Sequence, residues 1–185
     1  MRQAILFLIL LILLPVSVVM QDLLPGIPPS QERILLLPVV FCFGVLALPL
    51  IPALFFSLVA ALIQGLALIQ IQSGQAEFGF TLPVVFFLSW AIVLQMTSEA
   101  THGVRWELHA LGSGLVTLSL VAGQFLVLCI KRGGFPLDQV VFFRIGVPAA
   151  AAVLIAPPLY FALRSFVPMV SGVAEDLPKK PTFTR

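Results

Sequence analysis

Acidic, basic and imidazole side chains come closest together between residues 98 and 109, so acid-base or metal chemistry would have to lie there. Glu99 and His102 are three positions apart, which resembles half of a carboxylate-histidine metal motif, but the second half is missing. Gly103 disfavours a helix that would carry both side chains. The spacing also differs from the His-Glu-x-x-His pattern of zinc proteases. We therefore predict a solvated loop without a metal site, a catalytic residue or a cofactor.

The composition is typical of a membrane protein. Of the 185 residues, 60% are hydrophobic and 10% are charged, whereas about 25% of the residues of a soluble domain are charged. The mean hydropathy is +1.13. The basic residues are scattered at the ends of hydrophobic runs rather than gathered in a stripe, which argues against nucleic-acid binding. The expected solvent of this chain is therefore the lipid bilayer.

Hydrophobic runs predict an all-α integral membrane protein, a bundle of six transmembrane helices within residues 1–167. The run from 34 to 71 covers 38 residues, about 57 Å as one helix, so Pro49 and Pro52 must divide it into two spans. The first run lacks small residues at a signal-peptidase cleavage position, and we expect it to remain as an uncleaved helix. The predicted spans are 4–20, 34–49, 53–71, 81–97, 110–130 and 140–163, followed by a cytoplasmic tail at 168–185.

The distribution of Lys and Arg favours cytoplasmic N- and C-termini. In this orientation six basic residues lie on the cytoplasmic side and four lie outside. Leaving out the basic residues of the tail reverses the balance to three against four. Arg2 decides the orientation because it directly precedes the first helix.

The predicted spans contain neutral polar residues but no Asp, Glu, Lys or His, and Arg144 lies at the start of the sixth. Proton pumps and ion-coupled transporters usually hold an ionisable group at mid-membrane. The neutral side chains can instead join helices by hydrogen bonds, or line a site for a small polar ligand. Cys42 and Cys129 lie at different depths, so we expect two free thiols that act as small apolar residues. We also expect Pro148, Pro157 and Pro158 to kink or interrupt the sixth helix.

Small residues recur at helix-packing intervals in the third and fifth predicted spans. A spacing of four residues places them on one helix face, where a second backbone can approach closely. These faces pack either within the chain or against a partner. The candidate packing or partner contacts are Ser57, Ala61, Gly65, Gln70, Arg105, Gly114, Ser119 and Gly123, and Ala110 belongs to the same face as Gly114.

Short motifs follow the helices in a characteristic order. Glu32-Arg33-Ile34 opens the second predicted helix, and Leu46-Ala47-Leu48-Pro49 marks the following turn. The third helix ends with the string from Gly65 to Ser73-Gly74. The last helix contains Ala156-Pro157-Pro158-Leu159-Tyr160 and reaches Arg164. This order resembles the bacterial rod shape-determining protein family MreD. That family commonly has an Asp near the end of the third helix, where this chain has Gln70.

The resemblance implies a non-catalytic scaffold of the cell-elongation complex in the bacterial inner (cytoplasmic) membrane. The partners implied are an MreC-like single-span protein, the cytoskeletal protein MreB and the peptidoglycan synthase and transpeptidase, with segment 98–109 as a candidate contact. A rival interpretation is the substrate-binding membrane subunit of an energy-coupling-factor-type vitamin importer, which has a similar size and number of helices. The importer requires a ligand pocket with polar or aromatic walls, whereas the scaffold does not. An assembly factor for another membrane complex is a third possibility.

Overall fold

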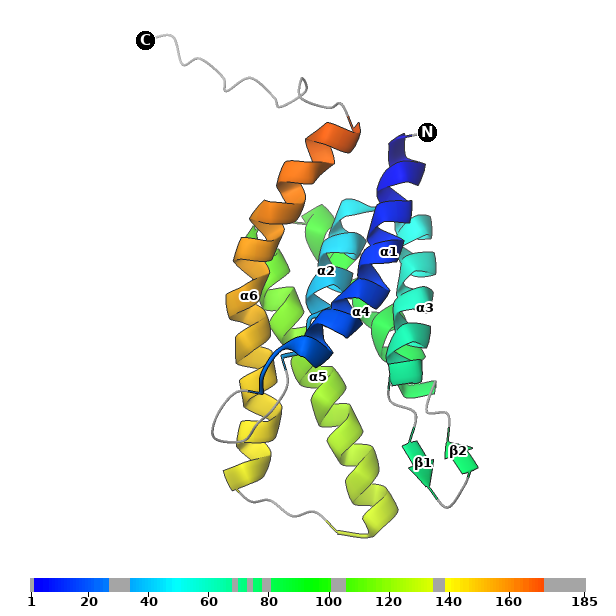
Figure 1. Cartoon of the computed structure of the whole chain (residues 1–185), viewed down its shortest axis with the longest axis vertical. Helices are drawn as coiled ribbons and strands as arrows, with labels where there is room; N and C mark the ends of the chain where they lie inside the picture. Colours follow the sequence, from blue (N-terminus) through cyan, green and yellow to red (C-terminus); the bar gives the residue numbers. More distant parts are fainter. Residues whose placement is uncertain are drawn as a thin grey trace.

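The computed structural model describes residues 2–26, 34–67, 70–72, 75–77, 81–100, 106–134 and 139–171. These residues form a bundle of six helices with a small β-hairpin (Figure 1). The elements are α1 (Arg2–Leu23), α2 (Leu37–Ala47), α3 (Leu50–Ala67), β1 (Gln70–Gln72), β2 (Gln75–Glu77), α4 (Thr81–Ala100), α5 (Trp106–Arg132) and α6 (Gln139–Ser171).

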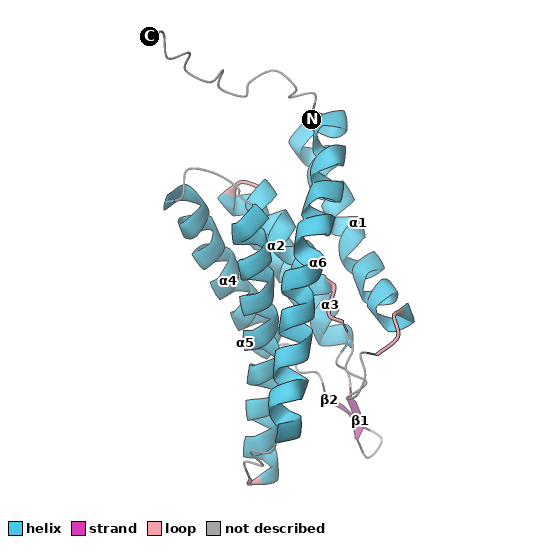
Figure 2. Cartoon of the chain, turned by 90° about the vertical axis from the view of Figure 1, so that its left-hand side faces the viewer, coloured by secondary structure: helices cyan, strands magenta, loops and turns pink. Residues whose placement is uncertain are grey.

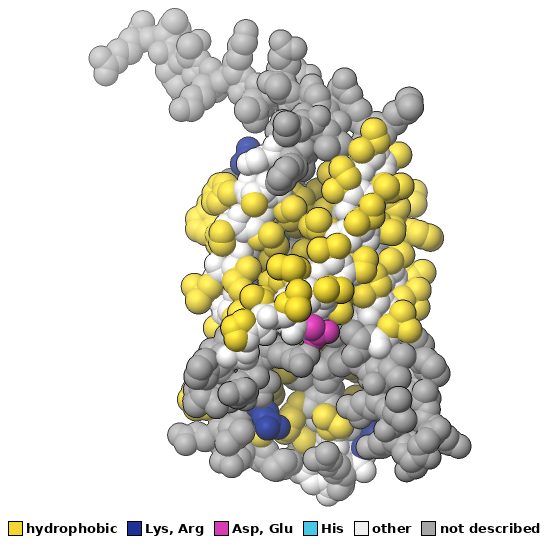
Figure 3. Space-filling model, viewed as in Figure 1, with side chains coloured by type: hydrophobic (Ala, Val, Ile, Leu, Met, Phe, Trp, Pro, Cys, Tyr) yellow, Lys and Arg dark blue, Asp and Glu magenta, His cyan; other side chains and the backbone are white. Residues whose placement is uncertain are grey.

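Four helices, α1, α4, α5 and α6, are long and apolar enough to cross a membrane. On the face drawn in Figure 3, hydrophobic side chains form a broad band, with charged side chains at its edges or beyond them. The charged side chains whose exposure is described, such as Asp22, Lys131 and Arg164, are all exposed. The prediction of a helical, multi-pass membrane protein is confirmed at this level, and the strands β1 and β2 are an addition that the sequence did not predict.

Helix α2 differs from the predicted second span at 34–49. It has 11 residues, which gives a length of about 16 Å, half of the roughly 30 Å hydrocarbon core of a bilayer. Pro38 lies in its first turn and Leu48 is extended at its end. Ten of the residues of α2 are buried, Leu37 through Leu46, and the helix contacts each of the other five. The second span is therefore corrected to a short helix enclosed by the bundle.

The third predicted span, 53–71, is also shorter at its end than expected. Helix α3 ends at Ala67, and Gln70 lies in β1, where it pairs with Glu77 of the antiparallel strand β2. Gln70-Ile71-Gln72 alternates polar and apolar residues, which is the period of a strand rather than of a helix. At the other end, Pro52 lies within the first turn of α3, where a missing N–H breaks no helical hydrogen bond.

The remaining helices extend beyond their predicted limits. Helix α1 continues to Leu23, α4 to Ala100, and α5 begins at Trp106, so most of the predicted loop at 98–109 is helical. Helix α6 is not interrupted by its prolines and continues to Ser171, past the predicted start of the tail at 168. His102, Gly103 and Arg105 lie outside the described residues.

The helices run alternately in opposite directions along the bundle. Helix α1 begins and α6 ends at one end, while the hairpin, the end of α5 and the start of α6 lie at the other (Figures 1 and 2). Helices α5 and α6 pack along each other, and α4 packs against α3 and α5. The short α2 lies between these helices and α1, so all five other helices contribute to its surroundings.

Candidate functional site

A side chain from α4 holds the C-terminal end of α2. The Nε2 atom of Gln95 lies 2.5 Å from the carbonyl oxygen of Val45 and 2.8 Å from that of Leu48. In a continuous helix, these carbonyls would accept hydrogen bonds from the N–H groups four residues later. Those positions are Pro49 and Pro52, and proline has no N–H. The Gln95 amide therefore supplies donors that the two prolines lack.

A second polar side chain contacts the N-terminal half of α2. His109 of α5 is fully buried, and its Nε2 lies 3.0 Å from the carbonyl oxygen of Val39. The ring centroid of His109 is 5.9 Å from that of Phe43 in α2 and 5.5 Å from that of Tyr160 in α6. His109 therefore joins three helices, and Nε2 donates to Val39 in the tautomer that carries its proton there.

The position of His109 corrects the sequence interpretation, which placed it in a solvated loop. Helix α5 begins one turn earlier, at Trp106, and carries His109 into the bundle. Its Nδ1 atom has no hydrogen-bond partner among the described residues. Trp106 itself is 45% exposed, consistent with a side chain at the edge of the bundle.

The hydroxyl groups next to His109 bond within their own helix. Ser113 Oγ donates to the carbonyl of His109 at 2.6 Å, and Thr117 Oγ1 donates to the carbonyl of Ser113 at 2.7 Å. Both side chains are fully buried. Such bonds to the preceding turn satisfy a hydroxyl in an apolar interior without a ligand. Cys42 and Cys129 are free thiols and are buried, as predicted.

The small residues at the C-terminal half of α5 bring it against α4. Ser119 Oγ accepts a hydrogen bond of 2.8 Å from Nε1 of Trp90. A Cβ atom at Gly123 would lie 2.9 Å from the ring of Phe86. Ser119 and Gly123 therefore form an internal helix contact.

The other small residues also pack inside the chain. A Cβ atom at Gly114 would lie 2.3 Å from Cγ2 of Val153 in α6, and Ala110 packs with Ala152 and Ala156 of that helix. In α3 the candidate residues are buried, namely Ser57, Ala61 and Gly65. Of the two remaining candidates, Gln70 lies in the hairpin and Arg105 lies outside the described residues. The structure thus assigns six of the eight candidates to packing within the chain, Ser57, Ala61, Gly65, Gly114, Ser119 and Gly123.

The candidate acid-base groups lie in different environments. Glu99 and Glu107 are exposed, whereas His109 is enclosed. In the part of the chain that the structure describes, no group of three His, Cys, Asp or Glu residues is placed to hold a metal ion. His109 and Gln95 both hydrogen-bond to backbone carbonyls of α2 or of the residue that follows it. We therefore assign both residues a structural role around α2.

Comparison with known proteins finds no family model, no curated protein and no solved structure that matches this chain.

Proposed function

We propose that the chain is a non-catalytic scaffold of the MreD type in the bacterial inner membrane. In this role it holds an MreC-like single-span protein and links it to MreB and to peptidoglycan synthesis. The observation that carries the proposal is that polar side chains join the helices of the bundle to one another. Gln95, His109 and Ser119 each bond to another helix of the same chain. Polar side chains that join helices in this way favour a fixed framework over a chamber for a reaction or a soluble ligand.

The proposal includes six passages through the membrane with cytoplasmic termini. The alternating directions of the helices support this number (Figure 1). Helix α2 is too short to cross alone, but the other five helices enclose it, so little of its backbone has to meet lipid. Arg2 begins α1, and Arg164 lies near the end of α6, so both stand at the end that we assign to the cytoplasm.

The partner helix is proposed to lie along the outer face of α1. The small residues are occupied by packing within the chain, so the outer surface is what remains for a partner. Helix α1 is the least enclosed of the four long helices, with 17% of its span buried against 33% for α5. Its outer face presents Ile5, Leu8, Ile12, Val16 and Val19. Helices associate in lipid through van der Waals fit, which these side chains can provide.

The vitamin importer is the second candidate, and one observation favours it. An open groove of about 500 Å³ lies between α1 and the start of α3, within the volume range of small-molecule sites. Seven of its eight lining residues are apolar, and Gln3 is the exception. A polar vitamin would leave most of its hydrogen-bonding groups unpaired there, so we prefer the scaffold.

Depletion of the chain from its host distinguishes these two functions. We expect rod-shaped cells to become round while vitamin uptake per unit of membrane stays unchanged. Re-expression of the wild-type chain should restore the rods, which controls for effects on neighbouring genes. Cells that keep their shape but lose uptake of one vitamin would contradict the scaffold and support the importer.

A further inference from the structure

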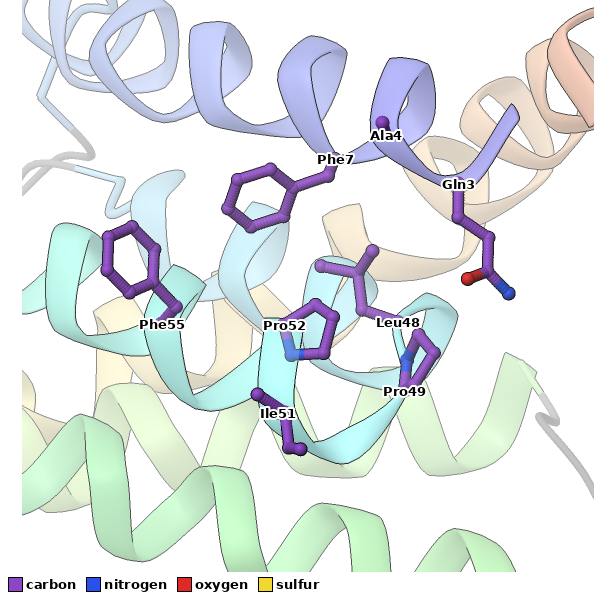
Figure 4. A pocket seen from close by; sticks show the side chains of 8 residues that line it. All are labelled: Gln3, Ala4, Phe7, Leu48, Pro49, Ile51, Pro52 and Phe55. Carbon is purple, nitrogen blue, oxygen red and sulfur yellow. The ribbon is translucent and has the colours of Figure 1, made fainter. Parts of the chain in front are cut away.

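An open apolar groove lies where the first two turns of α1 pass the turn between α2 and α3. Its volume is about 500 Å³. Figure 4 shows Gln3, Ala4 and Phe7 on the α1 side, facing Leu48, Pro52 and Phe55 on the other. The cavity is therefore formed by two parts of the chain that are more than 40 positions apart.

The walls of the groove are fixed by contacts already described. Leu48 is 4% exposed, and its carbonyl is held by Gln95. The rings of Phe7 and Phe55 contact each other in a tilted arrangement, with centroids 6.3 Å apart, and so join α1 to α3 beside the groove. Ile51 and Phe55 are both exposed, so the groove opens sideways to whatever surrounds the bundle. For a membrane-embedded chain, that surrounding medium is lipid.

The size of the groove favours a lipid chain over a protein helix. A helix with its side chains is about 10–12 Å wide and so occupies roughly 400–600 Å³ for each turn of 5.4 Å. The groove could hold about one turn, whereas a transmembrane helix has about 20 residues. An acyl chain is thinner and has no polar backbone to satisfy.

Charge and polarity change at one end of the groove. Gln3 is the polar residue in the lining, and Arg2 precedes it as the first residue of α1. This is also the end of the bundle where α6 finishes (Figure 1). An anionic phospholipid has the matching distribution, with an apolar chain and a negatively charged phosphate. Basic residues at a membrane surface attract such lipids.

We propose that the groove binds one acyl chain of an anionic phospholipid, with its phosphate at the N-terminal end of α1, beside Gln3. This inference concerns a lipid site and does not depend on the scaffold function. A lipid at this position fills the space between α1 and α3 that protein side chains leave open.

The test uses the full-length chain reconstituted with equal amounts of phosphatidylglycerol and phosphatidylcholine of identical acyl chains. Native mass spectrometry then counts the lipids that remain bound. We expect one retained phosphatidylglycerol, preferred over phosphatidylcholine by about tenfold or more. Equal retention of the two lipids would overturn the assignment of the headgroup.

Two α1 variants test the location. Ala4→Phe fills the groove and should lower phosphatidylglycerol retention by at least tenfold. Leu23→Phe adds the same ring at a position that is 74% exposed and outside the groove, and should retain lipid as the wild type does. A third α1 variant, Arg2→Gln, tests the headgroup and should reduce the preference for phosphatidylglycerol to less than threefold. Unchanged retention in Ala4→Phe would overturn the proposal.

A measurement on the unmodified chain keeps the test independent of how the variants fold. Phosphatidylglycerol with a photoreactive group in its acyl chain should label α1 near Phe7 and α3 near Phe55. Labelling spread evenly over the exposed helices would contradict a specific site. A co-purifying protein helix that blocks this labelling would identify a protein as the occupant and would also overturn the proposal.

Discussion

The side-chain amide of Gln95 in α4 stands in for the backbone N–H that Pro49 lacks, because it bonds the Val45 carbonyl four residues before that proline. The same nitrogen bonds Leu48, whose helical partner would be Pro52. One glutamine thus provides donors for both carbonyls at a proline-rich turn. Without this donor, two carbonyls would lack partners where lipid offers none.

The first prediction concerns the energy of this contact. Gln95→Leu should lower the free energy of unfolding in bicelles by about 1–3 kcal/mol, because it leaves buried carbonyls without a donor. Gln124→Leu is the matched control, since Nε2 of Gln124 has no hydrogen-bond partner among the described residues. Steric trapping measures both values. Equal losses of unfolding free energy for the two variants would show that the hydrogen bonds of Gln95 to α2 do not stabilise the fold.

The second prediction concerns the contact between α5 and α6. Gly114→Ala places a Cβ against Val153 and should cost about 1–3 kcal/mol of unfolding free energy through overpacking. Adding Val153→Ala should recover part of that loss. Gly146→Ala is the control, because a Cβ there meets nothing within 4 Å, and it should stabilise the helix by about 0.5–1 kcal/mol. A Gly114→Ala variant as stable as the wild type would contradict the close approach of α5 and α6 at this position.

The sequence predicts the class of fold well because hydrophobic runs and prolines are local signals. The reversal at Pro49 and the free thiols at Cys42 and Cys129 follow from such signals. The length of α2 does not follow from local signals, because a helix this short is accommodated only where the other five helices enclose it. A run of apolar residues has the same appearance whether it faces lipid or protein.

The sequence indicates the acceptors of the polar contacts at α2 but not their donor. The carbonyls of Val45 and Leu48 can be identified as lacking donors from the prolines four residues later. Their donor cannot be identified, since Gln95 lies 50 and 47 positions away in the chain. His109 was misplaced because the polar residues around it favoured a loop, whereas α5 begins at Trp106.

The third prediction separates the hydrogen bond of His109 from its ring packing. His109→Phe keeps a ring between Phe43 and Tyr160 but cannot donate to Val39. It should cost about 0.6–1.7 kcal/mol of unfolding free energy, from the average to the largest hydrogen-bond energy found by double-mutant cycles in a membrane protein. His109→Ala also removes the ring and should cost about 2–5 kcal/mol, because a cavity remains. Thermal unfolding in one detergent compares them. A phenylalanine variant as unstable as the alanine variant would show that the bond dominates.

The fourth prediction is the membrane topology. Reporter fusions at Ser30, Gln75 and Gly134 should report an external location, and fusions at Thr101 and Thr182 a cytoplasmic one. Gln75 lies in the hairpin and Gly134 follows α5, at the same end of the bundle. A cytoplasmic signal at Gln75 with an external one at Gly134 would contradict the alternating arrangement.

The scaffold function is tested most directly by the amount of MreC-like single-span protein that co-purifies with the tagged chain from native membranes. The wild type should retain this partner in a fixed ratio. Ile12→Trp, on the outer face of α1, should weaken the association by roughly 5- to 150-fold, which corresponds to an overpacking cost of about 1–3 kcal/mol. Leu154→Trp is the control, at an exposed position of α6, and should retain the partner fully. A wild-type chain that retains no such partner, and instead binds a vitamin tightly after purification, would contradict the account.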